Sequence, residues 1–132
     1  YELLKAADGC VNYKGVASPS DSVNILKDYF ALLFPTKFYT EGIPGTIIDA
    51  YSAGVPIITS IWVNAGDVLE EGVTGWGYEF GNVAGLEKLL DKAAQLPNDF
   101  LKMKESCLIK AQNYHSDYVV KKIDKLVSPY SR

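Results

Sequence analysis

Apolar positions follow two patterns along the chain, and together they predict an α/β protein. Continuous or alternating apolar runs are typical of strands, and they occur at residues 11–16, 31–34, 55–59 and 76–80. Apolar spacings of three and four are typical of helices, and they occur over residues 22–30, 46–53, 65–71, 82–94, 99–114 and 116–127. Residues 2–7 resemble the end of a further helix, which Gly9 terminates.

The order of these elements predicts the topology. Strands alternate with helices, so we expect an α/β fold with a Rossmann-like, doubly wound parallel sheet of about four strands, right-handed crossovers and C-terminal helices. The run Ala31–Phe34 is apolar at every position, as in a strand buried on both faces. The last predicted helix has an apolar side that should face a core, formed by Val119, Val120, Ile123 and Val127.

The segment after the run Ala31–Phe34 carries the strongest chemical signal. Glu41 and Asp49 lie eight positions apart, and between them a glycine-containing turn leads into a helix. Such a helix N-terminus offers backbone N–H groups and a positive dipole end to a phosphate, and the carboxylates could accept hydrogen bonds from sugar or ribose hydroxyls. The pattern favours recognition of a nucleotide-sugar. The turn residues expected to bind it are Gly42, Ile43, Pro44, Gly45 and Thr46.

Several of these residues also have a purely structural interpretation. Thr46 and Asp49 have the spacing of a capping box, in which Thr46 would be the N-cap. Gly42 and Gly45 could simply form a turn. Lys37, in the same loop, could offer charge to a phosphate, although a solvated lysine is the expected state.

The remaining conspicuous side chains are expected to pack. His115 is the one histidine, between two predicted helices, where a structural role is favoured over general-base chemistry. Trp62 and Trp76 are expected in the core rather than on a carbohydrate-stacking surface. Tyr39 is the exception, because it neighbours Glu41 in the proposed ligand loop.

The centre of this segment resembles the retaining glycosyltransferases of the GT-B fold, in the large group called family 4 (glycosyl transferases group 1). Their C-terminal domains carry a Glu-x7-Glu motif within a phrase like P-S-x-x-E-G-F-G-x-x-x-x-E-A-x-A-x-G-x-P-V-I. The matching positions here are Phe34-Pro35-Thr36, Glu41-Gly42, Asp49-Ala50, Ala53-Gly54 and Val55-Pro56-Ile57-Ile58. Thr74-Gly75 is similar to the family's later D-G-x-T-G turn, and the resemblance covers about residues 11–127.

The resemblance implies roles for individual residues. Glu41 would contact the donor sugar and is the expected catalytic residue, in a mechanism that relies on orientation and electrostatics. Asp49 would bind ribose hydroxyls, and Val16 would lie against the nucleobase through main-chain groups. Two departures from the family phrase stand out: the second acid is Asp49 rather than Glu, and Pro44 is inserted before Gly45.

The resemblance also implies that residues 1–132 form part of the donor-binding C-terminal domain of a two-domain enzyme. The chain starts at Tyr1, and its only methionine is Met103, so we expect a piece of a longer polypeptide. The N-terminal domain and the segment G-R…K-G, whose Arg and Lys usually grip the donor diphosphate, are not in this sequence. The isolated chain is therefore predicted to be inactive.

Composition limits the binding partners and the cellular compartment that we expect for the protein. A net charge of −3 argues against nucleic acid as a partner. Cys10 and Cys107 do not have the spacing of a zinc site, and we expect two reduced, mostly buried thiols in a cytoplasmic protein. No apolar run reaches the roughly 18 residues of a membrane span, although the full-length polypeptide could attach peripherally at the inner membrane face. Neither a metal nor another cofactor is expected.

Three classes of function remain. The favoured one is transfer of a sugar, with retention of configuration, from a UDP- or GDP-sugar to a glycan or lipid acceptor, as in the synthesis of cell-surface polysaccharide. The second is a related GT-B enzyme, such as a nucleotide-sugar epimerase or a phosphorylase. The third is a non-catalytic α/β interaction module, which the exchange of the second Glu for Asp49 keeps open.

Overall fold

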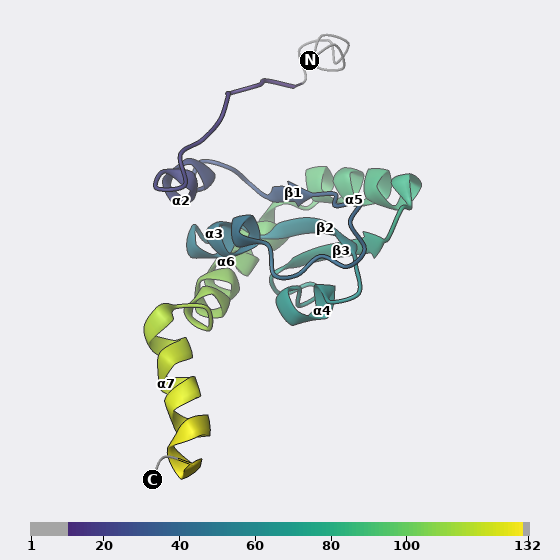
Figure 1. Cartoon of the computed structure of the whole chain (residues 1–132). Helices are drawn as coiled ribbons and strands as arrows, with labels where there is room; N and C mark the ends of the chain where they lie inside the picture. The colour runs from purple at the N-terminus through teal and green to yellow at the C-terminus, as the bar shows by residue number, and fades with distance from the viewer. Residues whose placement is uncertain (1–10, 131–132) are drawn as a thin grey trace.

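A computed structural model describes residues 11–130 and contains a parallel three-stranded sheet with helices on both faces (Figure 1). The strands β1 (Leu32–Phe34), β2 (Ile57–Ile61) and β3 (Gly75–Glu79) lie in the order β1-β2-β3. All pairs are parallel, with Leu32 opposite Ile57 and Ile57 opposite Gly75. The α/β class and the parallel sheet predicted from the sequence are confirmed.

The predicted fourth strand is absent from the described residues. Segment 11–16 is exposed and joins no ladder, although Val11 and Tyr13 alternate with polar residues as in a strand. The segment runs away from the sheet instead (Figure 1). The predicted helix at residues 2–7, and Cys10, lie outside the described residues.

The helices occupy the predicted stretches, mostly with shifted ends. Their bounds are α2 (Ser22–Leu26), α3 (Gly45–Ser52), α4 (Ala65–Val68), α5 (Val83–Gln95), α6 (Pro97–Gln112) and α7 (Ser116–Val127), followed by the 3₁₀ turn η1 (Ser128–Tyr130). One face of the sheet carries α5, and the other carries α3 and α4 (Figure 1). The start of α6 lies by α5, where Phe100 contacts Trp76 edge to face, and α6 then packs along α3.

The core lies between the sheet and these helices. Strand β2 is buried over four of its five residues, because it has a neighbour on each side. Trp62 and Trp76 are both buried, which confirms their predicted core role. Strand β1 was expected to be buried on both faces, and this is wrong: β1 is an edge strand, and Leu33 is 44% exposed.

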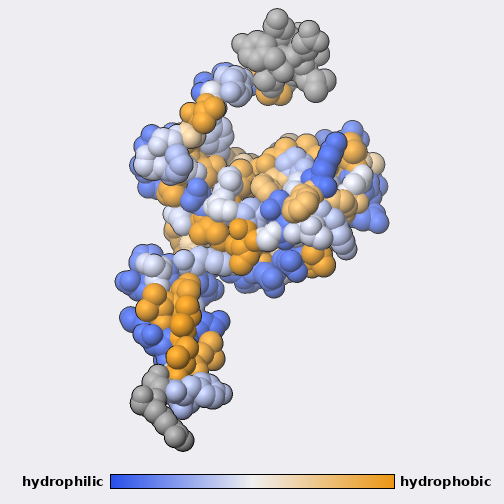
Figure 2. All heavy atoms as spheres, in the orientation of Figure 1, coloured by the Kyte–Doolittle hydropathy of each residue, from blue (hydrophilic) through white to orange (hydrophobic). Residues whose placement is uncertain are grey.

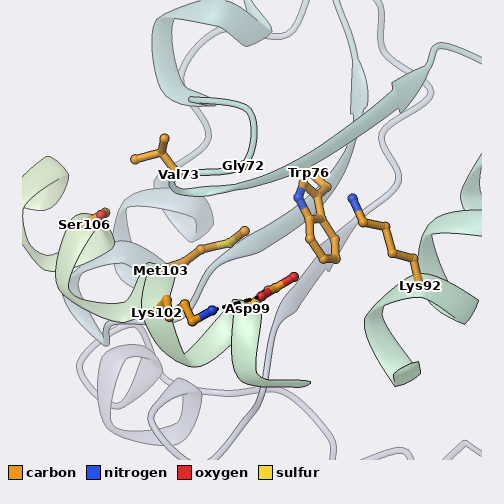
Figure 3. A pocket seen from close by; sticks show the side chains of 8 residues that line it. All are labelled: Gly72, Val73, Trp76, Lys92, Asp99, Lys102, Met103 and Ser106. Atoms are coloured by element: carbon orange, nitrogen blue, oxygen red, sulfur yellow. Dashed lines mark hydrogen bonds and ion pairs between the residues drawn. The ribbon is translucent and has the colours of Figure 1, made fainter. Parts of the chain in front are cut away.

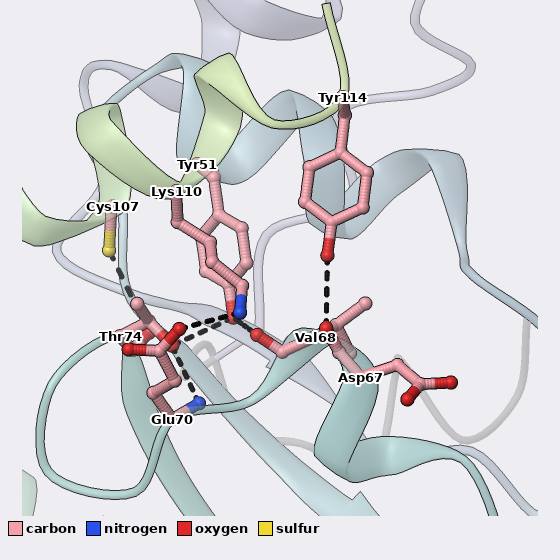
Figure 4. A network of polar contacts seen from close by, with 8 residues as sticks. All are labelled: Tyr51, Asp67, Val68, Glu70, Thr74, Cys107, Lys110 and Tyr114. Carbon is pink, nitrogen blue, oxygen red and sulfur yellow. Dashed lines mark hydrogen bonds and ion pairs between the residues drawn. The ribbon is translucent and has the colours of Figure 1, made fainter. Parts of the chain in front are cut away.

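A buried polar network joins α3, α4 and α6 below the sheet (Figure 4). The Tyr51 hydroxyl donates to the Val68 carbonyl at 3.1 Å and lies 3.1 Å from the Thr74 hydroxyl. The Thr74 hydroxyl accepts the Glu70 N–H, and the Thr74 carbonyl accepts the Cys107 thiol at 3.7 Å. The network fixes the turn before β3, where a Cβ on Gly75 would clash with the Ile57 carbonyl oxygen.

Two contacts, one from α6 and one from the residues just after it, complete this network at its edge. Lys110 forms an ion pair with Glu70 at 2.6 Å, and the Tyr114 hydroxyl donates to the Asp67 carbonyl at 3.1 Å. The first contact joins the segment between α4 and β3 to α6, and the second joins α4 to the residues that follow α6 (Figure 4). Burial raises the pKa of Tyr114 and raises that of the Cys107 thiol from 9.0 to about 12, so both groups stay protonated at neutral pH.

The last helix does not pack as the sequence predicted. Helix α7 projects from the body of the molecule (Figure 1) and has no buried residue; Ile123, for example, is 52% exposed. The amphipathic pattern is present, because apolar side chains form a stripe along α7 (Figure 2), but the described residues do not cover this stripe. The His115 side chain is exposed and does not pack, but the residue has a structural role as the N-cap of α7, where its carbonyl accepts the N–H groups of Tyr118 and Val119.

Candidate functional site

The loop of residues 35–44 forms the candidate site at the carboxyl edge of the sheet. It leaves the end of β1 and enters the N-terminus of α3, so it brings Glu41 to the edge where α/β sheets usually bind their ligands. Hydrogen bonds from the neighbouring strand fix its course. Thr59 Oγ1 donates to the Phe34 carbonyl at 2.8 Å, and Ser60 Oγ donates to the Thr36 carbonyl at 2.9 Å.

The segment after β2 holds the far part of the same loop. The Val63 N–H donates to the Tyr39 carbonyl at 3.1 Å, and Asn64 Nδ2 approaches the Glu41 carbonyl at 3.4 Å. The Tyr39 ring packs edge to face on Phe80, with ring centres 5.0 Å apart. Side chains and backbone from two neighbouring strands therefore hold the backbone that carries Glu41.

The Glu41 side chain is half-buried, and among residues 11–130 its carboxylate has one side-chain partner. Thr36 Oγ1 donates to Glu41 Oε2 at 3.3 Å, and the same Thr36 oxygen accepts the Phe38 N–H at 3.1 Å. At 3.3 Å the contact with Glu41 is longer than a strong charge-assisted hydrogen bond, so the carboxylate keeps most of its capacity to accept. A carboxylate of this kind is suited to accept hydrogen bonds from ligand hydroxyls.

Helix α3 begins two residues earlier than a Thr46 cap would require. Pro44 is the N-cap, and its carbonyl accepts the N–H groups of Ile47 and Ile48. Within residues 11–130 no side chain caps the helix, so the alternative interpretation of Thr46 and Asp49 as a capping box is wrong. Asp49 is the fifth helical residue, beyond the first turn, and a capping role does not explain why an acid lies there.

The state of the Asp49 side chain fits a group that is available to a ligand. It is half-buried on α3, and within residues 11–130 its carboxylate forms no hydrogen bond or ion pair. A carboxylate that is partly shielded from water gains more from a new donor than a fully exposed one. The structure thus leaves both acids of the motif with free acceptor capacity.

The two glycines of the motif have no packing reason to be glycine. A Cβ built on Gly42 or Gly45 would meet no atom within 4 Å, and neither residue has a positive φ. The turn interpretation, in which the backbone itself demands glycine, is therefore not supported. Open space beside the first turn of α3 leaves room for a ligand to approach the backbone N–H groups.

The structure brings most of the predicted site residues together but not Val16. Gly42, Ile43, Pro44, Gly45 and Thr46 are consecutive between Glu41 and the first turn of α3. Val16 is 95% exposed in the segment that runs away from the sheet. The predicted contact of Val16 with a nucleobase therefore has no counterpart in this arrangement.

The residues that hold the loop were not found from the sequence. Thr36, Ser60 and Asn64 are separated by up to 28 positions, and a sequence pattern does not show which backbone groups their side chains reach. Trp62 is buried after β2 as expected, but the sequence did not show that its indole N–H has no hydrogen-bond partner among the described residues.

A cavity of about 360 Å³ opens at the opposite, amino edge of the sheet (Figure 3). None of the predicted site residues lines it. Its charged groups already have partners, because Lys92 lies 3.7 Å from the centre of the Trp76 ring and Lys102 lies 3.5 Å from Asp99. This cavity is therefore a weaker candidate than the loop that carries Glu41.

Two further features bear on the kind of site. Within residues 11–130, no set of three or more His, Cys, Asp or Glu side chains is placed to hold a metal ion. In the same part of the chain, no helix combines the length and apolar character needed to cross a membrane. The chemistry of the loop rests on carboxylates, hydroxyls and a helix N-terminus.

Comparison with known proteins identifies the class to which this strand, loop and helix belong. Residues 5–126 match the family model described as Glycosyl transferases group 1, so the chain belongs to this family of glycosyltransferases. A particular relative is Lipopolysaccharide 1,6-galactosyltransferase of Escherichia coli (strain K12), which is 38% identical over 63 residues. The aligned part is 47% of this chain and 17% of the length of that relative.

Proposed function

We propose that this chain supplies the donor-binding site of a glycosyltransferase that uses a nucleotide-diphosphate sugar. Membership of the group 1 glycosyltransferases supports transfer of a sugar to an acceptor. The single observation that carries the proposal is the pair of acids around the start of α3, both with free acceptor capacity and separated by an open glycine turn. This arrangement suits a ligand that has hydroxyls on both sides of a diphosphate.

The roles follow from position. The first turn of α3 binds the phosphate next to the sugar through its free N–H groups and its partial positive charge. Glu41 accepts hydrogen bonds from the sugar hydroxyls and orients the anomeric carbon. Asp49 accepts from the ribose hydroxyls, with a side chain one methylene shorter than the Glu of the family phrase. Open space at Gly42 and Gly45 permits close contact with the backbone.

The reaction proceeds with retention of configuration. The bond between the anomeric carbon and the phosphate oxygen breaks, the acceptor oxygen bonds to the same face of that carbon, and the acceptor proton passes to the departing phosphate oxygen. No protein nucleophile takes part, so the protein contributes orientation and stabilisation of the charge that develops on the phosphate. The motif alone has two acids near this phosphate, and basic groups from outside these 132 residues must balance them.

Those basic groups come from a segment like the family's G-R…K-G, and a second, N-terminal GT-B domain closes over the loop of residues 35–44. The name of the Escherichia coli relative describes a galactosyl transfer to lipopolysaccharide. By extension, we assign this chain a UDP- or GDP-hexose as donor and a glycan or lipid of the cell surface as acceptor. The full-length polypeptide would then work in the cytoplasm or at the inner membrane face, where such acceptors are presented.

The test uses a full-length polypeptide that contains these residues. Glu41→Gln should lower kcat by about tenfold or more, which corresponds to about 1.4 kcal/mol of lost transition-state stabilisation. Asp49→Asn should mainly raise KM for the donor. Matched exchanges on the exposed side of α5, Glu87→Gln and Asp91→Asn, should leave both constants unchanged.

Three results would count against this proposal. If the α5 control variants changed kcat and KM as much as the Glu41 and Asp49 variants, the effect would come from net charge and not from the position of these acids. Unchanged kinetics for both Glu41→Gln and Asp49→Asn would remove these acids from the site. The full-length polypeptide could also bind a protein partner but neither hydrolyse any UDP- or GDP-sugar nor transfer the sugar from it. The non-catalytic interaction module, which the shorter acid at Asp49 keeps open, would then be the better interpretation.

A further inference from the structure

A second cavity lies at the carboxyl edge of the sheet, next to the loop that carries Glu41. It has a volume of about 220 Å³ and lies between the end of β1, the end of β3 and the start of α5. Its walls are largely apolar and aromatic. The residues that make them are Pro35, Tyr78, Phe80, Val83 and Leu86.

The size of this cavity limits what it can hold. A volume of 220 Å³ equals the liquid volume of about seven water molecules and is smaller than the 300–1,000 Å³ of typical ligand pockets. It is large enough for one ring or a short alkyl chain, while the rest of the ligand stays outside. Because the walls offer few polar partners, water inside would lose hydrogen bonds, and an apolar group would displace it favourably.

The mouth of the cavity carries a positive charge. Lys37 lines it and is exposed, and within residues 11–130 its ammonium group forms no ion pair. An apolar wall with one free ammonium group at the entrance is complementary to an amphiphile that carries an anionic head. A neutral ring or chain would contact the apolar walls but would form no ion pair with Lys37.

The cavity is also in contact with the loop of the candidate site. Thr36 lines the cavity, and its hydroxyl donates to Glu41 at 3.3 Å. Phe80, on the opposite wall, packs edge to face on Tyr39 of the same loop. A group bound in the cavity therefore touches two residues that hold the backbone and the side chain of Glu41.

We propose that this cavity binds the apolar end of a small anionic amphiphile, with the head at Lys37, immediately beside the loop of residues 35–44. The proposal stands on the walls of the cavity and on the charge at its mouth, and it does not depend on sugar transfer. Its failure and the failure of the proposed function can therefore be told apart.

Octyl phosphate is the probe, with octyl glucoside and inorganic phosphate for comparison, and each is titrated into the ¹⁵N-labelled chain. The two octyl compounds are kept below their micelle concentrations. Octyl phosphate should cause saturable amide shifts at residues 35–37, 78–81 and 83–86, with smaller shifts at Tyr39 and Glu41. Octyl glucoside should bind the same residues more weakly, by about two- to fivefold, which is the range for one exposed charge pair. Inorganic phosphate alone should cause no saturable shifts there.

Two variants locate the binding, and both change exposed positions, so folding should be preserved. Val83, at the rim, is 67% exposed, and Val83→Trp should block the cavity and weaken octyl phosphate binding by about tenfold or more. Lys37→Gln should reduce affinity for octyl phosphate to that for octyl glucoside. Leu126→Ala, on the exposed stripe of α7, is the matched control and should leave the cavity shifts unchanged.

Several outcomes would overturn the proposal. Shifts confined to α7, or shifts that grow without saturation, would show adsorption to exposed apolar surface. Inorganic phosphate that binds as well as octyl phosphate would reduce the site to an anion contact at Lys37. Full binding to the Val83→Trp variant, with its fold confirmed by its amide spectrum, would place the ligand elsewhere.

Discussion

Replacing Tyr51 with Phe tests the buried network that joins α3 to the turn before β3. The Tyr51 side chain is fully buried, and its hydroxyl donates to the Val68 carbonyl and contacts the Thr74 hydroxyl, each at 3.1 Å. Phe fills nearly the same volume, so the change removes hydrogen bonds and leaves no large cavity. The Val68 carbonyl then remains buried without this donor.

The size of the effect follows from these contacts. A buried polar group left without its partner costs about 1–3 kcal/mol, so Tyr51→Phe should lower the free energy of unfolding by about 2 kcal/mol. For a chain of 132 residues, this corresponds to a fall in Tm of about 7 °C. The exposed Tyr118 on α7 provides the matched control, and Tyr118→Phe should change Tm by less than about 1 °C.

Alkaline pH gives the same variant a second readout. Burial raises the pKa of Tyr51 well above its ordinary value of 10.0. The unfolded chain therefore loses the Tyr51 proton near pH 10 while the folded chain retains it, and stability falls as pH rises above 10, by up to about 1.4 kcal/mol per pH unit. Tyr51→Phe removes this contribution, so the difference between the two proteins should shrink above pH 10.

The assay is urea unfolding followed by circular dichroism at pH 7.5 and between pH 9 and 11. A loss smaller than about 0.5 kcal/mol at pH 7.5 would show that the Val68 carbonyl finds another donor. A difference that stays constant up to pH 11 would contradict the raised pKa of Tyr51. Either result would refute the network as the element that fixes this turn.

Three other predictions concern separate parts of the molecule. Asn82 Oδ1 accepts the Gly85 N–H at 2.9 Å, so Asn82→Ala should lower the free energy of unfolding by about 1 kcal/mol in urea titrations. In a Cys10→Ser background, the buried Cys107 thiol, with its pKa near 12, should react with a thiol reagent at pH 8 only as fast as the chain opens, and denaturant should accelerate the reaction. Gly45→Ala should leave Tm equal or slightly higher, because the new Cβ meets no protein atom. It should weaken nucleotide binding by about tenfold, because the Cβ stands where the ligand approaches. A large fall in Tm would contradict this prediction.

The local elements of the fold were predictable because their signals are local. The apolar runs gave the three strands to within two residues, and Asn82 and Ser116 marked the starts of α5 and α7. Burial was harder to predict, since a pattern shows which face is apolar but not what covers it. The stripe on α7 and the alternation at residues 11–16 are both present, yet α7 has no buried residue and, within the described residues, no strand pairs with residues 11–16.

The acids and glycines of the candidate site were predictable from the sequence, but the contacts that hold their loop in place were not. The spacing of Glu41 and Asp49 and the glycines between them are sequence features, and the structure gathers them at the carboxyl edge of the sheet. The capping box failed because the Pro44 carbonyl already begins α3. The anchoring of the loop by Ser60 depends on a contact between positions 24 residues apart, which only the paired strands bring together.

The central claim is that the loop of residues 35–44 and the first turn of α3 bind the nucleotide part of a sugar donor. Titrating the ¹⁵N-labelled chain with UDP and with GDP tests it most directly. We expect weak but saturable amide shifts at Gly42, Gly45 and Thr46, and saturation at about tenfold higher nucleotide concentration in Gly45→Ala. Shifts confined to the start of α5 near Asn82, with no change around Gly45 at millimolar nucleotide, would contradict the claim.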